Sequence, residues 1–214
     1  MVTDIIEVPK ELIQNNQEIT LCVDIVYVQG LPFLATISVD IHFRTIQYMT
    51  NTKDDTIMEA LDNVFRVYNK GNFKIKEIRA DPEFIKISDD VLDDMDIHFN
   101  PTPAQAHEPF IERSNRALKE RVRAMISRLP YIKIPKWMVI SGVEQQVKWL
   151  NSFLVKSGVS SILSPRTIVT GKPINYNKQC TTHMGAYVLA HTENTPANTM
   201  QPQALSCIYL ALMK

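Results

Sequence analysis

The chain has 214 residues, of which 45% are hydrophobic and 21% are charged, a balance that indicates one ordinary domain with a real core and excludes global disorder. No apolar run approaches the roughly 20 residues that a membrane-spanning helix needs, and the N-terminal sequence MVTDIIEVPKELIQNN lacks the basic end and apolar stretch of a signal peptide. Its three cysteines are odd in number and widely spaced, so we expect no disulfide framework and an intracellular location.

The first part of the chain predicts a sheet with one helix. Residues 19–28 are almost continuously apolar and β-branched, which is typical of a central strand buried on both faces. Gln29 to Pro32 provide a turn into a hairpin partner at 33–39, and a third strand follows at 45–49. A helix from 54 to 69 and a strand at 73–79 complete a mixed sheet of α/β type. The apolar stripe of this helix is Ile57, Leu61, Val64, Phe65 and Tyr68.

The second part predicts a short strand at 97–99, a long helix at 108–129 and another helix at 136–153. We expect the long helix to bury Ile111, Leu118, Val122, Met125 and Leu129, and the next to use as anchors Trp137, Ile140, Val147 and Leu150. Short strands at 187–189 and 207–212 predict a small β appendage, cut off at the C-terminus. This gives a linker at 1–18, a core at 19–157 and a C-terminal extension at 158–214.

Charge is distributed unevenly although the formal net charge is +0. Residues 81–112 are rich in acids, and residues 113–136 are rich in bases. This distribution is compatible with a local nucleic-acid-binding surface, and equally with two solvated faces.

Three carboxylates stand where a metal site could form. Asp24 interrupts an apolar strand, which is costly unless the carboxylate is paired or binds a cation. Asp81 follows the end of another strand, and Glu112 lies in the first turns of the long helix. Carboxylates suit Mg²⁺, and two such ions about 3.5–4 Å apart support in-line phosphoryl displacement. The alternative is a strand aspartate satisfied by local hydrogen bonds and two unrelated surface acids.

A basic stripe continues from Glu112 along the same helix. Arg116, Lys119 and Arg123 follow it at i+4, i+7 and i+11 and therefore project from one face. Basic side chains beside a catalytic acid would bind DNA phosphates next to the metal ions. The alternative is a salt-bridged solvent face in which Glu112 pairs with Arg116.

The ordered combination of these motifs resembles the integrase cores of copia-type retrotransposons, within the retroviral integrase superfamily, most closely copia-like elements of diatoms and other algae. The motifs are Val23-Asp24-Ile25-Val26-Tyr27, Asp81-Pro82-Glu83-Phe84, the helix start Glu108-Pro109-Phe110-Ile111-Glu112-Arg113, Leu163-Ser164-Pro165-Arg166, and Gly185-Ala186-Tyr187-Val188. Together they span about residues 20–212.

This resemblance implies a ribonuclease-H-like (RNase-H-like) fold and an integrase of the Pol polyprotein type. It implies 3′-end processing of the element's DNA and strand transfer into target DNA, dependent on two Mg²⁺ or Mn²⁺ ions. Asp24, Asp81 and Glu112 fall on the family's catalytic and metal-binding positions. The DNA-binding residues we expect are Arg113, Arg116, Lys119 and Arg123. Double-stranded DNA is then the partner, a homo-oligomer the expected assembly, no membrane is involved, and integration occurs in the nucleus after a stage in a cytoplasmic particle.

Other functions remain open alternatives. Glycines that the family places beside the second and third carboxylates are absent from Asp81-Pro82-Glu83 and from the segment before Glu112. A catalytically decayed or domesticated DNA-binding or assembly module is therefore one alternative, and a nuclease or transposase on the same fold is another. A zinc site at Cys180, His183 and His191 has weak support, because the spacing is irregular and no CxxC partner is present.

Overall fold

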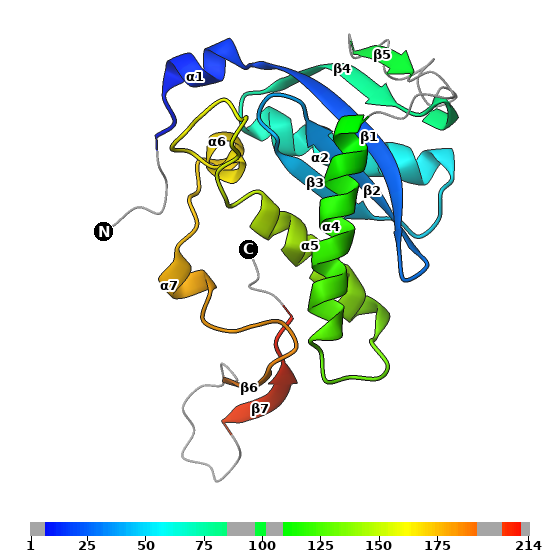
Figure 1. Ribbon diagram of the computed structural model, residues 1–214, viewed down its shortest axis with the longest axis vertical. Coiled ribbons are helices and arrows are strands. Elements are labelled where there is room, and N and C mark those ends of the chain that lie inside the picture. Colours follow the sequence, from blue (N-terminus) through cyan, green and yellow to red (C-terminus); the bar gives the residue numbers. More distant parts are fainter. Residues whose placement is uncertain (1–6, 85–96, 102–108, 192–202, 211–214) are drawn as a thin grey trace.

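A five-stranded mixed sheet forms the centre of the computed structural model, which describes residues 7–84, 97–101, 109–191 and 203–210 (Figure 1). The strand order is β3-β2-β1-β4-β5; β3, β2 and β1 pair antiparallel, and β1, β4 and β5 pair parallel. The predicted α/β mixed sheet is confirmed. Its strands are β1 (Glu18–Val28), β2 (Leu31–Ser38), β3 (Arg44–Tyr48), β4 (Lys74–Ala80) and β5 (His98–Pro101).

The strand β1 is buried on both faces because helices cover both sides of the sheet. Leu21 and Val23 belong to the core that β1 shares with α2 (Asp54–Lys70). Val26 and Val28 belong to the core that it shares with α4 (Pro109–Ser127) and α5 (Lys136–Leu150). Side chains alternate between the two faces of a strand, so the near-continuous apolar run of β1 is explained by two cores.

The α2 side of the sheet contains every apolar residue predicted for the stripe of that helix. It also includes Ile168 and Val169 of α6 (Pro165–Thr170), a helix that the sequence analysis missed. Partly buried Leu12 and Ile13 of α1 (Lys10–Asn15) pack against the same cluster. Parts of the expected linker and of the expected C-terminal extension therefore contact the main core, and the proposed boundaries at 18 and 157 stay predictions.

Helices α4 and α5 cross the other face of the sheet in close contact. A Cβ atom on Gly142 of α5 would lie 2.5 Å from the terminal carbon of Met125 on α4, so a larger residue there would require the Met125 side chain to move. The predicted α4 residues Ile111, Leu118 and Val122 are buried, while Met125 and Leu129 are half-buried. Glu108, the predicted first residue of this helix, lies outside the described residues.

The prediction that Trp137 anchors α5 was wrong. Its side chain is 68% exposed, whereas Val139, Ile140 and Val143 are buried against the sheet. Trp137 lies in the first turn of the helix and is not among its buried residues. There it lies 6.0 Å, centroid to Nζ, from Lys136, which also sits over the Tyr48 ring at 4.6 Å.

A small second sheet is formed by β6 (Tyr187–His191) and β7 (Ala204–Ile208), as expected for a C-terminal appendage. The predicted last strand began too late, since β7 starts three residues before 207; positions 211 and 212 lie outside the described residues. The short helix α7 (Tyr176–Gln179) precedes β6 in the chain, and it was not predicted from the sequence. The appendage contacts the core through Tyr131, whose hydroxyl donates to the carbonyl of Gly185 at 2.9 Å.

Within the described residues, no helix combines the length and apolar character needed to cross a membrane.

One buried side chain fastens α5 to the sheet and gives a stability test. Asn151, 4% exposed, accepts a hydrogen bond from the backbone N–H of Arg44 at 2.8 Å and donates to its carbonyl at 2.7 Å. Asn151→Ala leaves both backbone groups of Arg44 unsatisfied, so we expect the free energy of unfolding in urea to fall by about 2–4 kcal/mol. Asn177→Ala, at an exposed position, should change it by less than about 0.5 kcal/mol; equal losses in both variants would contradict this role.

Candidate functional site

Asp24 lies in the middle of β1 on the face that α4 covers. Its Oδ1 accepts from the backbone N–H of Ile25 at 2.7 Å, and its Oδ2 accepts from Nδ2 of Asn115 on α4 at 2.6 Å. The residues on either side along this face are apolar: Cys22 packs against Ile111, and Val26 belongs to the cluster of α4 and α5. Asp24 is therefore a single carboxylate within an apolar helix–sheet interface.

Asn115 is the functional residue that the sequence analysis missed. It is 7% exposed and occupies the α4 position between Ile111 and Leu118 that faces β1. The sequence did contain a sign of this role. In the predicted apolar stripe of the long helix, the position four residues after Ile111 is occupied by Asn115 and not by an apolar residue. A buried amide in that gap requires a polar partner, and Asp24 provides it.

Asp81 is placed beside Asp24 by the register of two parallel strands. Val23 pairs with Ala80, so Asp24 and Asp81 are the next residues along neighbouring strands, which lie about 4.8 Å apart. Glu77 reinforces this register: its carboxylate accepts from Thr20 of β1 at 3.1 Å and from Asn100 of β5 at 3.0 Å. The predicted meeting of the strand carboxylates is therefore explained by sheet geometry.

The environment of Asp24 raises its pKa above the ordinary value of 3.8. Burial is the largest cause, since it penalises the charged form; the hydrogen bond from Ile25 opposes it, and the negative charge of Asp81 adds to it. Asn115 and the positive charge of Lys119 lower the pKa by smaller amounts. Two carboxylates that repel each other at a half-buried position form an arrangement that a cation would stabilise.

Glu112 reaches the site from the first turn of α4. A hollow of about 400 Å³, here called the carboxylate hollow, is lined by Asp24, Glu112, Asn115, Arg116, Lys119, Glu120 and Arg123. The structure thus brings Asp24 and Glu112 to one hollow and puts Asp81 within electrostatic reach of Asp24. In the part of the chain that the structure describes, no group of three or more His, Cys, Asp or Glu side chains is close enough to hold a metal ion.

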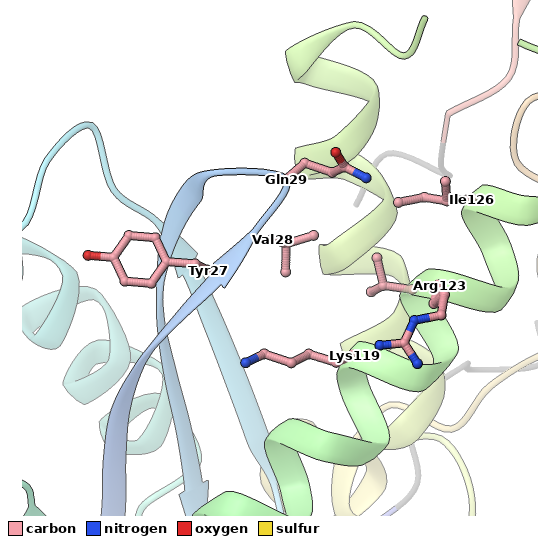
Figure 2. Close-up of a pocket in the computed structure, with 7 residues that line it drawn as sticks. Tyr27, Val28, Gln29, Lys119, Arg123 and Ile126 are labelled. Carbon is pink, nitrogen blue, oxygen red and sulfur yellow. The ribbon is translucent and has the colours of Figure 1, made fainter. Parts of the chain in front are cut away.

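The predicted basic residues separate into two groups. Arg116, Lys119 and Arg123 are exposed and line the carboxylate hollow, as their helical spacing predicts. Arg113 is also exposed but lines neither this hollow nor its neighbour. That neighbour, of about 240 Å³, is here called the distal hollow; Lys119 and Arg123 line it too (Figure 2).

Comparison with solved structures gives the fold a precedent. The catalytic core domain of BIV integrase superposes with a TM-score of 0.53 at 13% identity, covering 70% of this chain and 92% of that one. The HTLV-2 integrase catalytic core domain in complex with magnesium, in its trimeric form, gives a TM-score of 0.54 at 12% identity, covering 72% and 96%. The dimeric form of that complex gives 0.52 at 12% identity, with the same coverage. This chain has the fold of an integrase catalytic core.

The RNase-H-like fold expected from the motifs is therefore confirmed, with a two-stranded sheet added at the C-terminal side. At this level of identity the likeness shows the fold alone. No model of a protein family and no curated protein sequence matches the chain. The copia-type and algal character of the motifs stays a prediction.

The raised pKa of Asp24 predicts how stability depends on pH in the absence of divalent ions. A carboxyl whose folded-state pKa is raised stabilises the fold fully below its unfolded value, here 3.8, and that stability is lost as the pH rises through the folded-state pKa. Asp24→Asn removes the buried charge and keeps a side chain that can bond to Asn115. We expect this variant to be more stable than the parent in urea at neutral pH, with the difference vanishing below pH 3.8.

The matched control is Asp62→Asn, because Asp62 is an exposed α2 carboxylate paired with Arg66 at 2.6 Å. Its replacement should bring no gain at neutral pH. A metal-free Asp24→Asn protein that is less stable than the parent at neutral pH would show that burial does not dominate the energetics of this carboxylate.

Proposed function

We propose that this chain is the catalytic core of a retrotransposon integrase of the copia type, which processes DNA 3′ ends and joins them to target DNA. The observation that carries the proposal is the half-buried carboxylate of Asp24, beside Asp81 in strand register and in one hollow with Glu112. Three cations on the same helix as Glu112 line that hollow. The integrase-core fold supports the proposal independently of these residues.

The donor set fits a hard divalent cation. Mg²⁺ keeps several of its waters and is held in phosphoryl-transfer sites by one or two carboxylates together with substrate phosphates. Asp24 and Asp81 supply two adjacent carboxylates whose mutual repulsion a cation removes, and Glu112 supplies a third across the carboxylate hollow. We propose that Mg²⁺ or Mn²⁺ binds there, two ions per site when DNA phosphate completes the ligand set.

The side chains have distinct roles in this proposal. Bound ions would activate the attacking oxygen and stabilise the leaving oxygen of an in-line phosphoryl displacement. Asn115 holds Oδ2 of Asp24 through its Nδ2, which fixes the carboxylate plane and leaves the remaining lone pairs for a cation. Arg116, Lys119 and Arg123 bind phosphates of the DNA strand along α4 and position it beside the carboxylates.

The assembly and partner follow from the reaction. Joining two DNA ends to one target requires at least two catalytic chains, so we propose a homo-oligomer on double-stranded DNA, acting in the nucleus at the integration step. The HTLV-2 integrase catalytic core structures are described as trimeric and dimeric forms, which is consistent with oligomers on this fold.

A second candidate is a non-catalytic DNA-binding or assembly module derived from such an element. It is favoured by the absence, among the described residues, of three acids near enough to one another to hold a metal. It predicts DNA binding that is insensitive to the loss of any single carboxylate, together with no cleavage. A nuclease or transposase on the same fold would nick DNA without joining it.

The carboxylates give the decisive test. We expect Asp24→Asn, Asp81→Asn and Glu112→Gln each to lower Mg²⁺- or Mn²⁺-dependent strand transfer by about a hundredfold or more, because each removes several kcal/mol of transition-state stabilisation. The assay joins a labelled duplex end to plasmid DNA, and nicking is scored in parallel. Asp62→Asn and Glu59→Gln on α2 should retain full activity. Undiminished joining in the three site variants would overturn the two-metal proposal.

The cations give a separate test of DNA binding. Each phosphate contact contributes about 0.9 to the slope of log K against log salt concentration. Lys119→Ala and Arg123→Ala should therefore each reduce that slope by about 0.9 in fluorescence anisotropy with a duplex, and Lys70→Ala, at the exposed end of α2, should leave it unchanged. Equal slopes for all four proteins would mean that the DNA does not follow α4.

A further inference from the structure

The distal hollow lies between the end of β1 and the middle of α4 (Figure 2). It shares Lys119 and Arg123 with the carboxylate hollow, so the two hollows are neighbours along α4. Its lining consists of Tyr27, Val28, Gln29, Lys119, Val122, Arg123 and Ile126. The ring of Tyr27 points to the opposite side of β1 in Figure 2, so the interior is formed by the other side chains.

The chemistry of this lining is that of a nucleotide site. Val28, Val122 and Ile126 form an apolar floor, and both valines are buried in the core beneath it. Lys119 and Arg123 form a cationic rim, and no carboxylate among the described residues lines the hollow. An apolar surface suits the face of a base, and adjacent cations suit the phosphates on either side of it.

Gln29 adds a group that can distinguish one base from another. It is the first residue of the two-residue turn between β1 and β2. The φ angles are 52° at Gln29 and 76° at Gly30, and two consecutive left-handed residues of this kind are typical of tight hairpin turns. Hairpin pairing of Val28 with Leu31 holds the turn in place. The side-chain amide therefore extends from a fixed backbone at the edge of the hollow, and offers one acceptor and two donors.

Helix geometry gives the place of this hollow along a bound strand. Lys119 and Arg123 lie seven and eleven residues after Glu112, which is about 10 and 16 Å along the helix axis at about 1.5 Å per residue. Successive nucleotides of one B-form strand advance by about 3.4 Å. For a strand that runs along α4, the distal hollow is therefore about three to five nucleotides from the carboxylates.

We propose that the distal hollow binds one nucleotide of the processed DNA strand, about three to five positions from the reacting end, and that Gln29 determines which base is preferred there. This rests on the proposed integrase function and extends it with a sequence-reading residue. The base is unpaired, so that its face packs on Val28 and Ile126 and its edge bonds to the Gln29 amide, while its flanking phosphates bind Lys119 and Arg123.

The test uses the full chain and a fluorescein-labelled duplex that ends in a single-stranded 3′ overhang, in which the third, fourth and fifth nucleotides from the 3′ end are varied singly. Equilibrium binding is measured by anisotropy in Ca²⁺, which does not require catalysis. We expect the parent protein to prefer one base at one of these positions by on the order of tenfold. An abasic site at that position should lower affinity by a similar factor.

The variant Gln29→Asn keeps an amide that tolerates positive φ but shortens its reach, so it should lose the base preference while keeping the salt slope of the parent. Ile126→Ala should lower affinity for intact DNA and abolish the penalty of the abasic site. Gln14→Asn, the same change on exposed α1, should behave as the parent.

Three outcomes overturn the inference. In the first, the parent binds DNA ends without any base preference at these positions. In the second, Gln29→Asn retains the preference. In both of these the integrase proposal stands, because end binding and joining persist. In the third, the parent has no affinity for DNA at all, and then the proposed function fails together with the inference.

Discussion

The hydrogen bond from Nδ2 of Asn115 to Oδ2 of Asp24, at 2.6 Å, is the contact on which the candidate site depends. It places a carboxylate at the point where α4 crosses β1, in an interface that is otherwise apolar above and below. Burial of a charge costs free energy unless it is paired or hydrogen-bonded, so this contact and the backbone N–H of Ile25 make the position tolerable. They do not remove the cost, since the pKa of Asp24 stays raised. A site that is unfavourable without its ligand is typical of function selected at the expense of stability.

The sheet supplies the second constraint. A one-residue slip between β1 and β4 would turn Asp81 to the opposite face of the sheet from Asp24, because side chains alternate along a strand. The observed pairing of Val23 with Ala80 avoids this, and the Glu77 carboxylate ties β1, β4 and β5 together at that level. The positions of the two strand carboxylates are thus a consequence of register. Glu112 is independent of register, because it is brought in by the packing of α4.

Long, strongly periodic elements were predictable from the sequence, and so were several short strands, but the short helices α6 and α7 were not. The apolar run of β1 and the stripe of α2 leave one interpretation, since two-sided burial and a helical period of 3.6 are encoded in many residues. The helix α6 has a Ser164 cap, Pro165 and a left-handed Gly171, yet its six residues carry too little periodicity to be separated from a loop. Trp137 was misplaced because hydrophobicity predicts burial only on average, while its position in the first turn of α5 decides its exposure. Within the site, Asp24 could be proposed from its cost in an apolar strand, and Asp81 and Glu112 from their positions and the motif resemblance, but the contact of Asn115 with Asp24 required the crossing of α4 over β1.

The formal net charge of +0 is compatible with a DNA-binding surface because screening makes binding a local matter. At physiological ionic strength the Debye length is about 8 Å, so charges on distant faces contribute little to a bound strand. Binding of a strand therefore depends on the charges within that distance. Along α4 the carboxylates lie near the start of the helix, and Arg116, Lys119 and Arg123 follow. Two of these cations, Lys119 and Arg123, line both neighbouring hollows, and among the described residues no carboxylate lines the distal one. Lys119 links the carboxylates to the distal hollow: its positive charge lowers the pKa of Asp24, and its side chain lines both hollows. In the proposed integrase, a phosphate bound by Lys119 would weaken that effect, and the negative charge of Asp24 and Asp81 would then favour a divalent cation more strongly. On that proposal, DNA and metal ions would bind cooperatively.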